Sequence, residues 1–177
     1  RYFDPQHNQQ PKDIETIGRN YIGALTDEIG KWLQQIPEKE PIGVCFSGGI
    51  DSGAVFLATY HALKGLGMNP SRLKAFTLSI ADGEDHHQAF SFLDKLGLSM
   101  FLEVIEVEDT SLDVDQTLRI LEDYKPLDVE CGAMGLALCR AIRERYPNWK
   151  YLVDGDGGDE NLKDYPIEEN PELTIRS

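Results

Sequence analysis

The feature that most constrains the fold is an alternation of short apolar segments with segments of helical periodicity. Strands are indicated over Ile42–Phe46, Leu73–Ile80, Phe101–Val107 and Lys150–Asp154. Helices are indicated between them, over Ser52–Leu66, Asp85–Leu96, Ser111–Tyr124 and Ala133–Tyr146. Strands that alternate with helices are joined by parallel crossovers. The order therefore predicts an α/β fold with a doubly wound parallel sheet that helices cover on both faces.

A long amphipathic helix is predicted before the first strand. Apolar residues recur at helical spacing from Ile14 to Ile36, and Pro37 ends the pattern. Asp13 is a suitable N-cap for this helix, because its side chain can accept a hydrogen bond from a free N–H group of the first turn. We expect the helix to pack on the sheet domain.

Charge and hydropathy exclude two kinds of partner. The chain has 17 basic and 31 acidic residues, which gives a net charge of −14. Binding to duplex nucleic acid requires cations that neutralise phosphates, so we expect no nucleic-acid partner. No apolar stretch reaches the roughly 18 residues of a membrane span, so the sequence predicts no membrane partner and a cytoplasmic protein. Because Arg1 is not a natural first residue, we also expect the natural protein to be longer.

The three cysteines, Cys45, Cys131 and Cys139, form no CxxC pair. An odd number without short spacing argues against a zinc site and against a disulfide scaffold. Each cysteine lies in an apolar stretch, so we expect buried or half-buried thiols.

The first glycine-rich turn, SGGIDS, has the composition of an anion site. Ser47-Gly48-Gly49 follows the first strand directly, and Asp51-Ser52 opens the next helix. Glycines let the backbone curl closely around a ligand, and the N–H groups of a helix N-terminus favour an anion. A carboxylate beside a phosphate requires a hard cation between them, which indicates Mg²⁺ near Asp51. The turn lacks the lysine of GxxxxGK[ST] and the spacing of GxGxxG. The alternative is an ordinary strand-to-helix turn.

A second glycine-rich segment, DGDGGDE, follows the last predicted strand. Asp154, Asp156, Asp159 and Glu160 place four carboxylates close together there. Carboxylates so crowded repel one another unless a cation neutralises them, which indicates a metal role. A solvated acidic turn and a calcium loop are the alternatives, although the calcium spacing is only half met.

These two segments resemble those of a known group of enzymes. SGGIDS resembles the SGGxDS pyrophosphate-binding loop of the N-type ATP pyrophosphatases, which include asparagine, GMP, NAD and β-lactam synthetases. DGDGGDE aligns without a gap with the SGEGSDE stretch of the asparagine synthetases, and the resemblance covers roughly residues 41–165. It implies an adenine-nucleotide α-hydrolase-like fold. It also implies a reaction in which ATP adenylates a carboxylate, pyrophosphate leaves, and an amine or ammonia forms an amide.

The resemblance also implies the site, with ATP and Mg²⁺ as cofactors. Asp51 and Asp159 would hold the metal, and Asp156 stands at the position of the family's loop glutamate, as the catalytic candidate. The nucleotide would contact Phe46, Ser47, Gly48, Gly49, Asp51, Ser52, Leu78 and Gly155. The chain would divide into a lead-in and helix over 1–40, a nucleotide-binding domain over 41–165 and the start of a C-terminal part over 166–177.

The acceptor substrate stays open, because the departures from the family fall on its side of the site. Lys163-Asp164-Tyr165 keeps only the tyrosine of the family's Gly-Gly-Tyr, and Asp156 is shorter than glutamate. The expected partners are a small-molecule carboxylate and an amine or ammonia donor, and the resemblance also allows a glutaminase domain or subunit. Two alternatives remain. One is an ATP pyrophosphatase with a different acceptor, such as a β-lactam-synthetase-like enzyme. The other is a catalytically inactive nucleotide-binding module.

Overall fold

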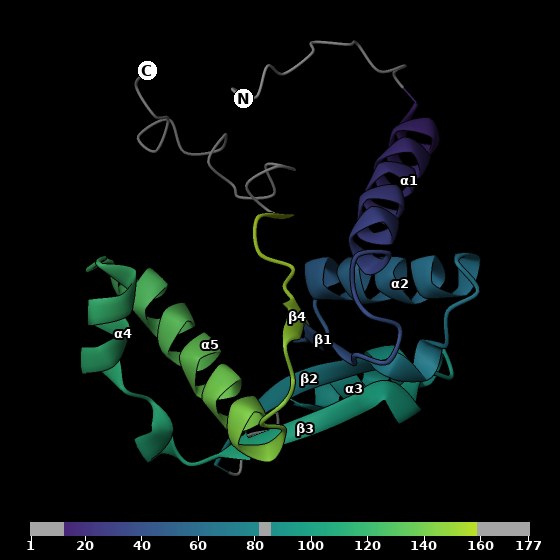
Figure 1. The fold of residues 1–177 in the computed structure, drawn as a ribbon. Helices are drawn as coiled ribbons and strands as arrows, with labels where there is room; N and C mark the ends of the chain where they lie inside the picture. The colour runs from purple at the N-terminus through teal and green to yellow at the C-terminus, as the bar shows by residue number, and fades with distance from the viewer. Residues whose placement is uncertain (1–12, 82–85, 159–177) are drawn as a thin grey trace.

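The computed structural model describes residues 13–81 and 86–158, which form one parallel sheet with helices on both sides (Figure 1). Three short 3₁₀ turns cover Pro70–Arg72, Ser99–Phe101 and Asp109–Ser111. The strands are β1 (Ile42–Cys45), β2 (Leu73–Ile80), β3 (Leu102–Val107) and β4 (Tyr151–Val153). The helices are α1 (Ile14–Leu33), α2 (Ile50–Gly65), α3 (His86–Lys95), α4 (Val114–Leu121) and α5 (Pro126–Arg145). None of the described helices is both long and apolar enough to cross a membrane.

The strand order is β3-β2-β1-β4, and every neighbouring pair is parallel. Strand β1 lies inside the sheet, with Val44 opposite Ala75 of β2 and Val153 of β4. Its apolar residues Ile42 and Val44 are fully buried, as expected for a strand that is covered on both faces.

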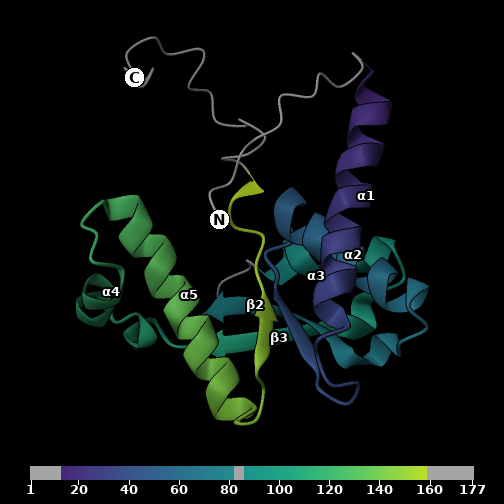
Figure 2. The ribbon, with the colours of Figure 1, turned by 45° about the horizontal axis from the view of Figure 1, so that its top comes forward.

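Two separate clusters of apolar side chains cover the two faces of the sheet. On one face, Val44 and Ala75 belong to the cluster that contains Phe56 of α2 and Leu93 of α3. On the other face, Phe76 and Ile105 pack with Leu138 and Ile142 of α5. Figure 2 shows the sheet between α5 on one side and α1–α3 on the other. The predicted doubly wound α/β sheet is therefore confirmed.

Helix α5 begins seven residues before the predicted start at Ala133, because Pro126 stands in its first turn. Proline suits that position, since its missing N–H group would have no partner within the helix. The preceding helix is shorter than predicted: α4 covers only Val114–Leu121. Glu122 ends it with a left-handed backbone (φ 54°), so the chain turns before α5.

Helix α1 is only partly packed. Its N-terminus is capped as expected, because the Asp13 side chain accepts a hydrogen bond from the Thr16 N–H group. Ile29 and Leu33 lie buried in the cluster that α1 shares with α2. By contrast, Ile14 is 88% exposed and Tyr21 is 41% exposed, so the apolar face continues onto a half of the helix that projects beyond α2 (Figure 1).

Candidate functional site

The SGGIDS turn lies at the point where the direction of the sheet's connections reverses. From β1 the chain passes through α2 on one face of the sheet, and it reaches β4 through α5 on the other face. Strands β1 and β4 are neighbours, so the loops at their carboxyl ends diverge and leave a crevice. Such a switch point is where doubly wound sheets bind ligands.

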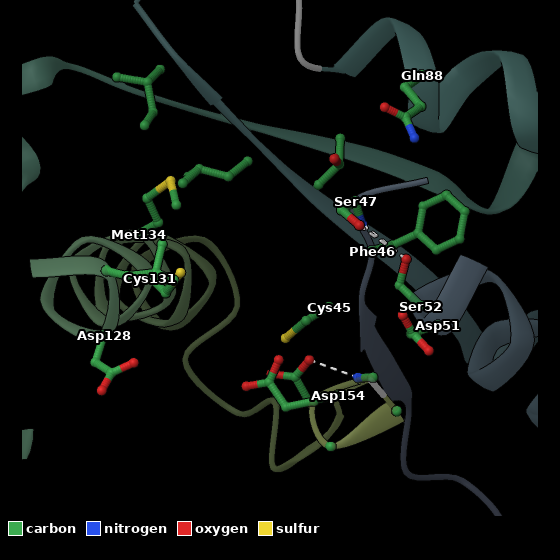
Figure 3. Close-up of a pocket in the computed structure, with 18 residues that line it drawn as sticks. Cys45, Phe46, Ser47, Asp51, Ser52, Gln88, Asp128, Cys131, Met134 and Asp154 are labelled. Atoms are coloured by element: carbon green, nitrogen blue, oxygen red, sulfur yellow. Dashed lines mark hydrogen bonds between the residues drawn. The ribbon is translucent and has the colours of Figure 1, made fainter. Parts of the chain in front are cut away.

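A cleft of about 960 Å³ opens at this point (Figure 3). Its walls come from the carboxyl ends of β1, β2 and β4, from the first turn of α3 and from the N-terminal half of α5. Seven of the predicted site residues line it: Phe46, Ser47, Asp51, Ser52, Leu78, Gly155 and Asp156. A cleft of this size fits a small-molecule ligand.

Hydrogen bonds within the first loop hold it in shape. The Ser47 N–H group donates to Ser52 Oγ over 3.3 Å, and the two serine hydroxyls lie 3.1 Å apart. The Gly49 N–H group donates to Ser47 Oγ over 3.2 Å. Gly49 is the N-cap residue of α2, and no side chain caps the N–H groups of the first turn. These N–H groups are therefore available as backbone donors. The loop therefore has the donor geometry of an anion site.

Gly48 is the residue of this loop that no other amino acid can replace without strain. Its backbone is left-handed (φ 80°), and a Cβ built on it would lie 2.7 Å from Ala89 N in the first turn of α3. Its carbonyl oxygen accepts a hydrogen bond from Gln88 Nε2 over 3.2 Å. Gly48 and Gly49 do not line the main cleft, and Gly48 borders a smaller hollow between α2 and α3. Helix α3 thus supports the loop from behind.

The two glycine-rich segments are in direct contact. A Cβ built on Gly155 would lie 2.8 Å from Ser52 N, so the second loop lies against the first turn of α2. A Cβ built on Gly158 would collide with the carboxylate of Asp51. The Asp51 side chain makes no ion pair with any described residue. Asp159, the second predicted metal ligand, lies outside the described residues.

Two of the predicted contact residues differ in what they can offer a nucleotide. Phe46 is 2% exposed. The centroid of its ring lies 5.6 Å from the ring centroid of Phe56 and 5.6 Å from that of Phe92. Its side chain therefore belongs to the core. Leu78, at the carboxyl end of β2, lines the cleft beside Ile80, so this part of the wall is apolar.

The charge of the cleft is entirely negative. Four carboxylates line it, from Asp51, Asp128, Asp154 and Asp156, and its described lining contains no lysine, arginine or histidine. One oxygen of Asp154 accepts a hydrogen bond from the N–H group of Gly155. An anionic ligand could enter only together with a cation.

The oxygen-rich lining suits Mg²⁺, which binds hard oxygen ligands. In the part of the chain that the structure describes, no three His, Cys, Asp or Glu side chains gather as a complete metal cage. That arrangement still fits Mg²⁺, because this ion uses one or two carboxylates and completes its shell with waters and phosphate oxygens.

The cysteines are free thiols, and two of them are more exposed than predicted. Cys45 is half-buried, as expected, whereas Cys131 and Cys139 lie exposed on α5. The buried residues of this part of α5 are Ala133, Ala137 and Leu138, while the cysteines fall on other faces of the helix. Burial, together with the negative charge of Asp154, raises the pKa of the Cys45 thiol to about 12. Cys45 is therefore protonated at neutral pH and is not a nucleophile there.

The sequence prediction missed the wall that α5 provides. Leu127, Cys131 and Met134 line the cleft at helical spacing, together with Asp128. The signal was present, because Pro126 followed by an acidic residue is typical of a helix start. Gln88 was also missed, since a lone glutamine in a helix carries no motif.

Comparisons with known proteins agree with this geometry. A family model described as "Asparagine synthase" matches residues 33–176. The NH3-dependent NAD synthetase from Campylobacter jejuni subsp. jejuni NCTC 11168, solved in complex with the nitrate ion, superposes with a TM-score of 0.52 and 17% identity. That match covers 83% of this chain and 60% of the NAD synthetase chain, and it shows the fold.

A second solved structure is a predicted subunit of tRNA methyltransferase from Methanocaldococcus jannaschii DSM, with 19% identity and a TM-score of 0.42. That match covers 76% of this chain and 62% of that one. No curated protein matches the chain.

Proposed function

Because the chain belongs to the asparagine synthase family and has its ATP-pyrophosphatase fold, we propose that it is part of an ATP-dependent, AMP-forming amide synthetase. The membership confirms the resemblance that the two glycine-rich segments indicate. The proposed reaction joins a carboxylate to AMP, releases pyrophosphate and forms an amide with an amine or ammonia. The chain spans 60% of the length of the NAD synthetase, so the activity of the whole protein is part of the proposal.

The observation that carries this proposal is the contact between the two loops at the switch point. The carboxylate of Asp51 lies against the backbone of Gly158, the residue before Asp159. This supports a shared role for the two aspartates, as expected for ligands of one cation.

In the proposed site the first loop binds the pyrophosphate part of ATP. The backbone donors of the first turn of α2, with the hydroxyls of Ser47 and Ser52, would bind its oxygens. Negative charge grows on the leaving pyrophosphate during attack at the α-phosphorus. Donors already oriented toward that charge stabilise the transition state without reorganisation.

Asp51 and Asp159 would hold Mg²⁺ beside this loop. When bound, the ion would neutralise the phosphates that the acidic cleft otherwise repels. Asp51 contributes a carboxylate that has no cationic partner among the described residues, so it is available to a metal.

The remaining walls suit the other parts of the substrates. The apolar patch of Leu78, Ile80 and Met134 fits a flat base. Asp156 lies on the second loop, where the acceptor would enter, and we assign it the handling of the acceptor carboxylate or the incoming amine. A glutaminase domain or subunit is one source of ammonia compatible with this scheme.

Identification of the nucleotide products tests the proposal. The protein with its natural flanking sequence is incubated with ATP, Mg²⁺, ammonia and a panel of carboxylates, and the nucleotides are separated by chromatography. AMP and pyrophosphate in equal amounts are expected. ADP as the main product would contradict the proposal.

The charged side chains in the described lining of the cleft are all acidic. This favours a second candidate, an inactive nucleotide-binding module, because catalysis of this kind normally also uses a lysine or arginine. Binding of ATP with Mg²⁺, without pyrophosphate release for any carboxylate, would support that candidate.

A further inference from the structure

Gln88 contacts the anion loop although it belongs to a different element. It lies in the first turn of α3, and its side chain lines the cleft on the same side as Ser47 and Ser52 (Figure 3). Its Nε2 donates to the carbonyl oxygen of Gly48 over 3.2 Å. This is a side-chain hydrogen bond between residues 40 positions apart, and it connects the β2–α3 side of the cleft to the β1–α2 loop.

The hydrogen bond fixes the orientation of one peptide plane. In a trans peptide the carbonyl and the following N–H group point in opposite directions. With the Gly48 carbonyl directed to Gln88, the Gly49 N–H group is directed to Ser47 Oγ, which it reaches over 3.2 Å. Ser47 lines the cleft, whereas Gly48 and Gly49 do not, so this peptide contacts the hydroxyl of Ser47 from outside the cleft.

Within the loop, the orientation of this peptide is supported by one hydrogen bond, from the Gly49 N–H group to Ser47 Oγ. Both residues that flank it are glycines, and Gly48 is already in the left-handed region (φ 80°). Glycine populates positive and negative φ with similar ease, so a rotation of the 48–49 peptide meets little steric resistance. The rotated peptide would direct a carbonyl oxygen, instead of an N–H group, toward Ser47 Oγ.

We propose that Gln88 is a positioning residue of the anion loop, which holds the Gly48–Gly49 peptide with its N–H group toward Ser47 Oγ and so orients the Ser47 hydroxyl in the cleft. The inference rests on the proposed function for the identity of the anion. The hydrogen bond itself is a property of the ligand-free protein. Its contribution to folding is small because Gln88 is exposed, whereas its contribution to anion binding is larger because it decides which atom of the peptide contacts the Ser47 hydroxyl.

Two variants separate positioning from a general structural role. Gln88→Met keeps the length of the side chain and removes the donor. Ser91→Ala, about one turn further along α3 and outside the main cleft, is the matched control. Calorimetric titration with ATP plus Mg²⁺, and with pyrophosphate plus Mg²⁺, gives the affinity. Hydrogen exchange of the Gly49 amide, followed by NMR without ligand, reports the peptide itself.

We expect Gln88→Met to weaken binding of both ligands about fivefold and to speed Gly49 exchange by a similar factor, the effect of one lost hydrogen bond. The melting temperature and the Ser91→Ala values should match those of the wild type. Unchanged exchange of the Gly49 amide in Gln88→Met would overturn the inference. If the wild type binds the ligands, an unchanged affinity in Gln88→Met would overturn it as well. If the wild type binds neither ligand while Gly49 exchange still rises, the positioning role is supported and the proposed function fails.

Discussion

At the scale of single residues, the two glycines of the first loop are present for different reasons. Gly48 has a left-handed backbone and lies against the backbone of α3, whereas Gly49 has an ordinary φ of −74° and space beside it. A Cβ on Gly49 would meet only Ser47 Oγ, at 3.3 Å. The sequence motif has glycine at both positions, but only at Gly48 do the backbone conformation and the close contact require it.

Gly48→Ala should therefore destabilise the fold, and Gly49→Ala should not. The left-handed backbone alone costs about 1–2 kcal/mol for alanine, and the contact with Ala89 adds to it. We expect a loss of at least about 2 kcal/mol in the free energy of unfolding for Gly48→Ala, measured by urea denaturation. For Gly49→Ala we expect less than about 1 kcal/mol. Equal losses in the two variants would show that the contact with α3 is not what selects glycine.

Asp51→Asn tests the metal ligand without changing the shape of the side chain. Asn has weaker affinity for Mg²⁺ than a carboxylate, so binding of ATP plus Mg²⁺ should weaken by roughly 10- to 100-fold. The matched control is Asp94→Asn, an exposed aspartate of α3 that does not line the cleft. Calorimetry gives both affinities. An Asp51→Asn protein that binds as tightly as the Asp94→Asn protein would refute the assignment.

At the scale of elements, the wall of the cleft that α5 provides depends on how this helix is fixed to the sheet. Its C-terminal end is held by Glu103 of β3, which accepts hydrogen bonds from Lys74 Nζ and Tyr146 Oη, each over 2.7 Å. Arg145 adds an ion pair at 3.0 Å. The Glu103 side chain is 13% exposed, so these contacts are only partly screened by water.

The Glu103 contacts predict a pH-dependent stability. Burial raises the pKa of Glu103, but the hydrogen bonds from Lys74 and Tyr146 outweigh it and leave the pKa below its usual value of 4.5. A lowered folded-state pKa means that the stabilisation is complete above pH 4.5 and is lost as the pH falls through the folded-state value.

Glu103→Gln should thus cost about 1–3 kcal/mol near pH 7, and the difference from the wild type should shrink below pH 4.5. Urea denaturation at several pH values measures it. Glu28→Gln, which removes the exposed pair of Glu28 with Lys31, is the control and should have almost no effect. A gap between Glu103→Gln and the wild type that widens as the pH falls would contradict this reading.

Elements that follow from local sequence patterns could be predicted, but the positions of these elements relative to one another could not. The four strands and the two loops follow from apolar runs and glycines, which act over a few residues. The role of α5 in the cleft depends on the crossover to the second face of the sheet, and no local pattern states which helix face meets the ligand. The contact of Gln88 with Gly48 has the same origin, because it joins residues 40 positions apart.

At the scale of the whole molecule, the charge distribution makes the binding of any anionic ligand in the cleft dependent on a cation. The chain carries a net charge of −14, and the described lining of the cleft has four carboxylates and no cationic side chain. Bringing the ATP anion into such a site without a cation is strongly unfavourable.

Removal of Mg²⁺ with EDTA should therefore weaken ATP binding at least about 100-fold, since the metal replaces the cationic side chains of other nucleotide sites. Addition of excess Mg²⁺ should restore it. Equilibrium dialysis with labelled ATP provides the measurement, and magnesium-independent binding would show that cations outside the described residues neutralise the phosphates.

The fold also brings together two glycine-rich segments that are more than 100 residues apart, and the proposed nucleotide site depends on their contact. The most direct test is a crystal structure of the protein with Mg²⁺ and an ATP analogue that cannot be cleaved between the α- and β-phosphates. We predict the β- and γ-phosphates at the Ser47–Ser52 loop and one Mg²⁺ bound by Asp51 and Asp159, with oxygen distances of about 2.0–2.1 Å. A triphosphate bound away from this loop, or a metal that contacts neither aspartate, would contradict the proposed site.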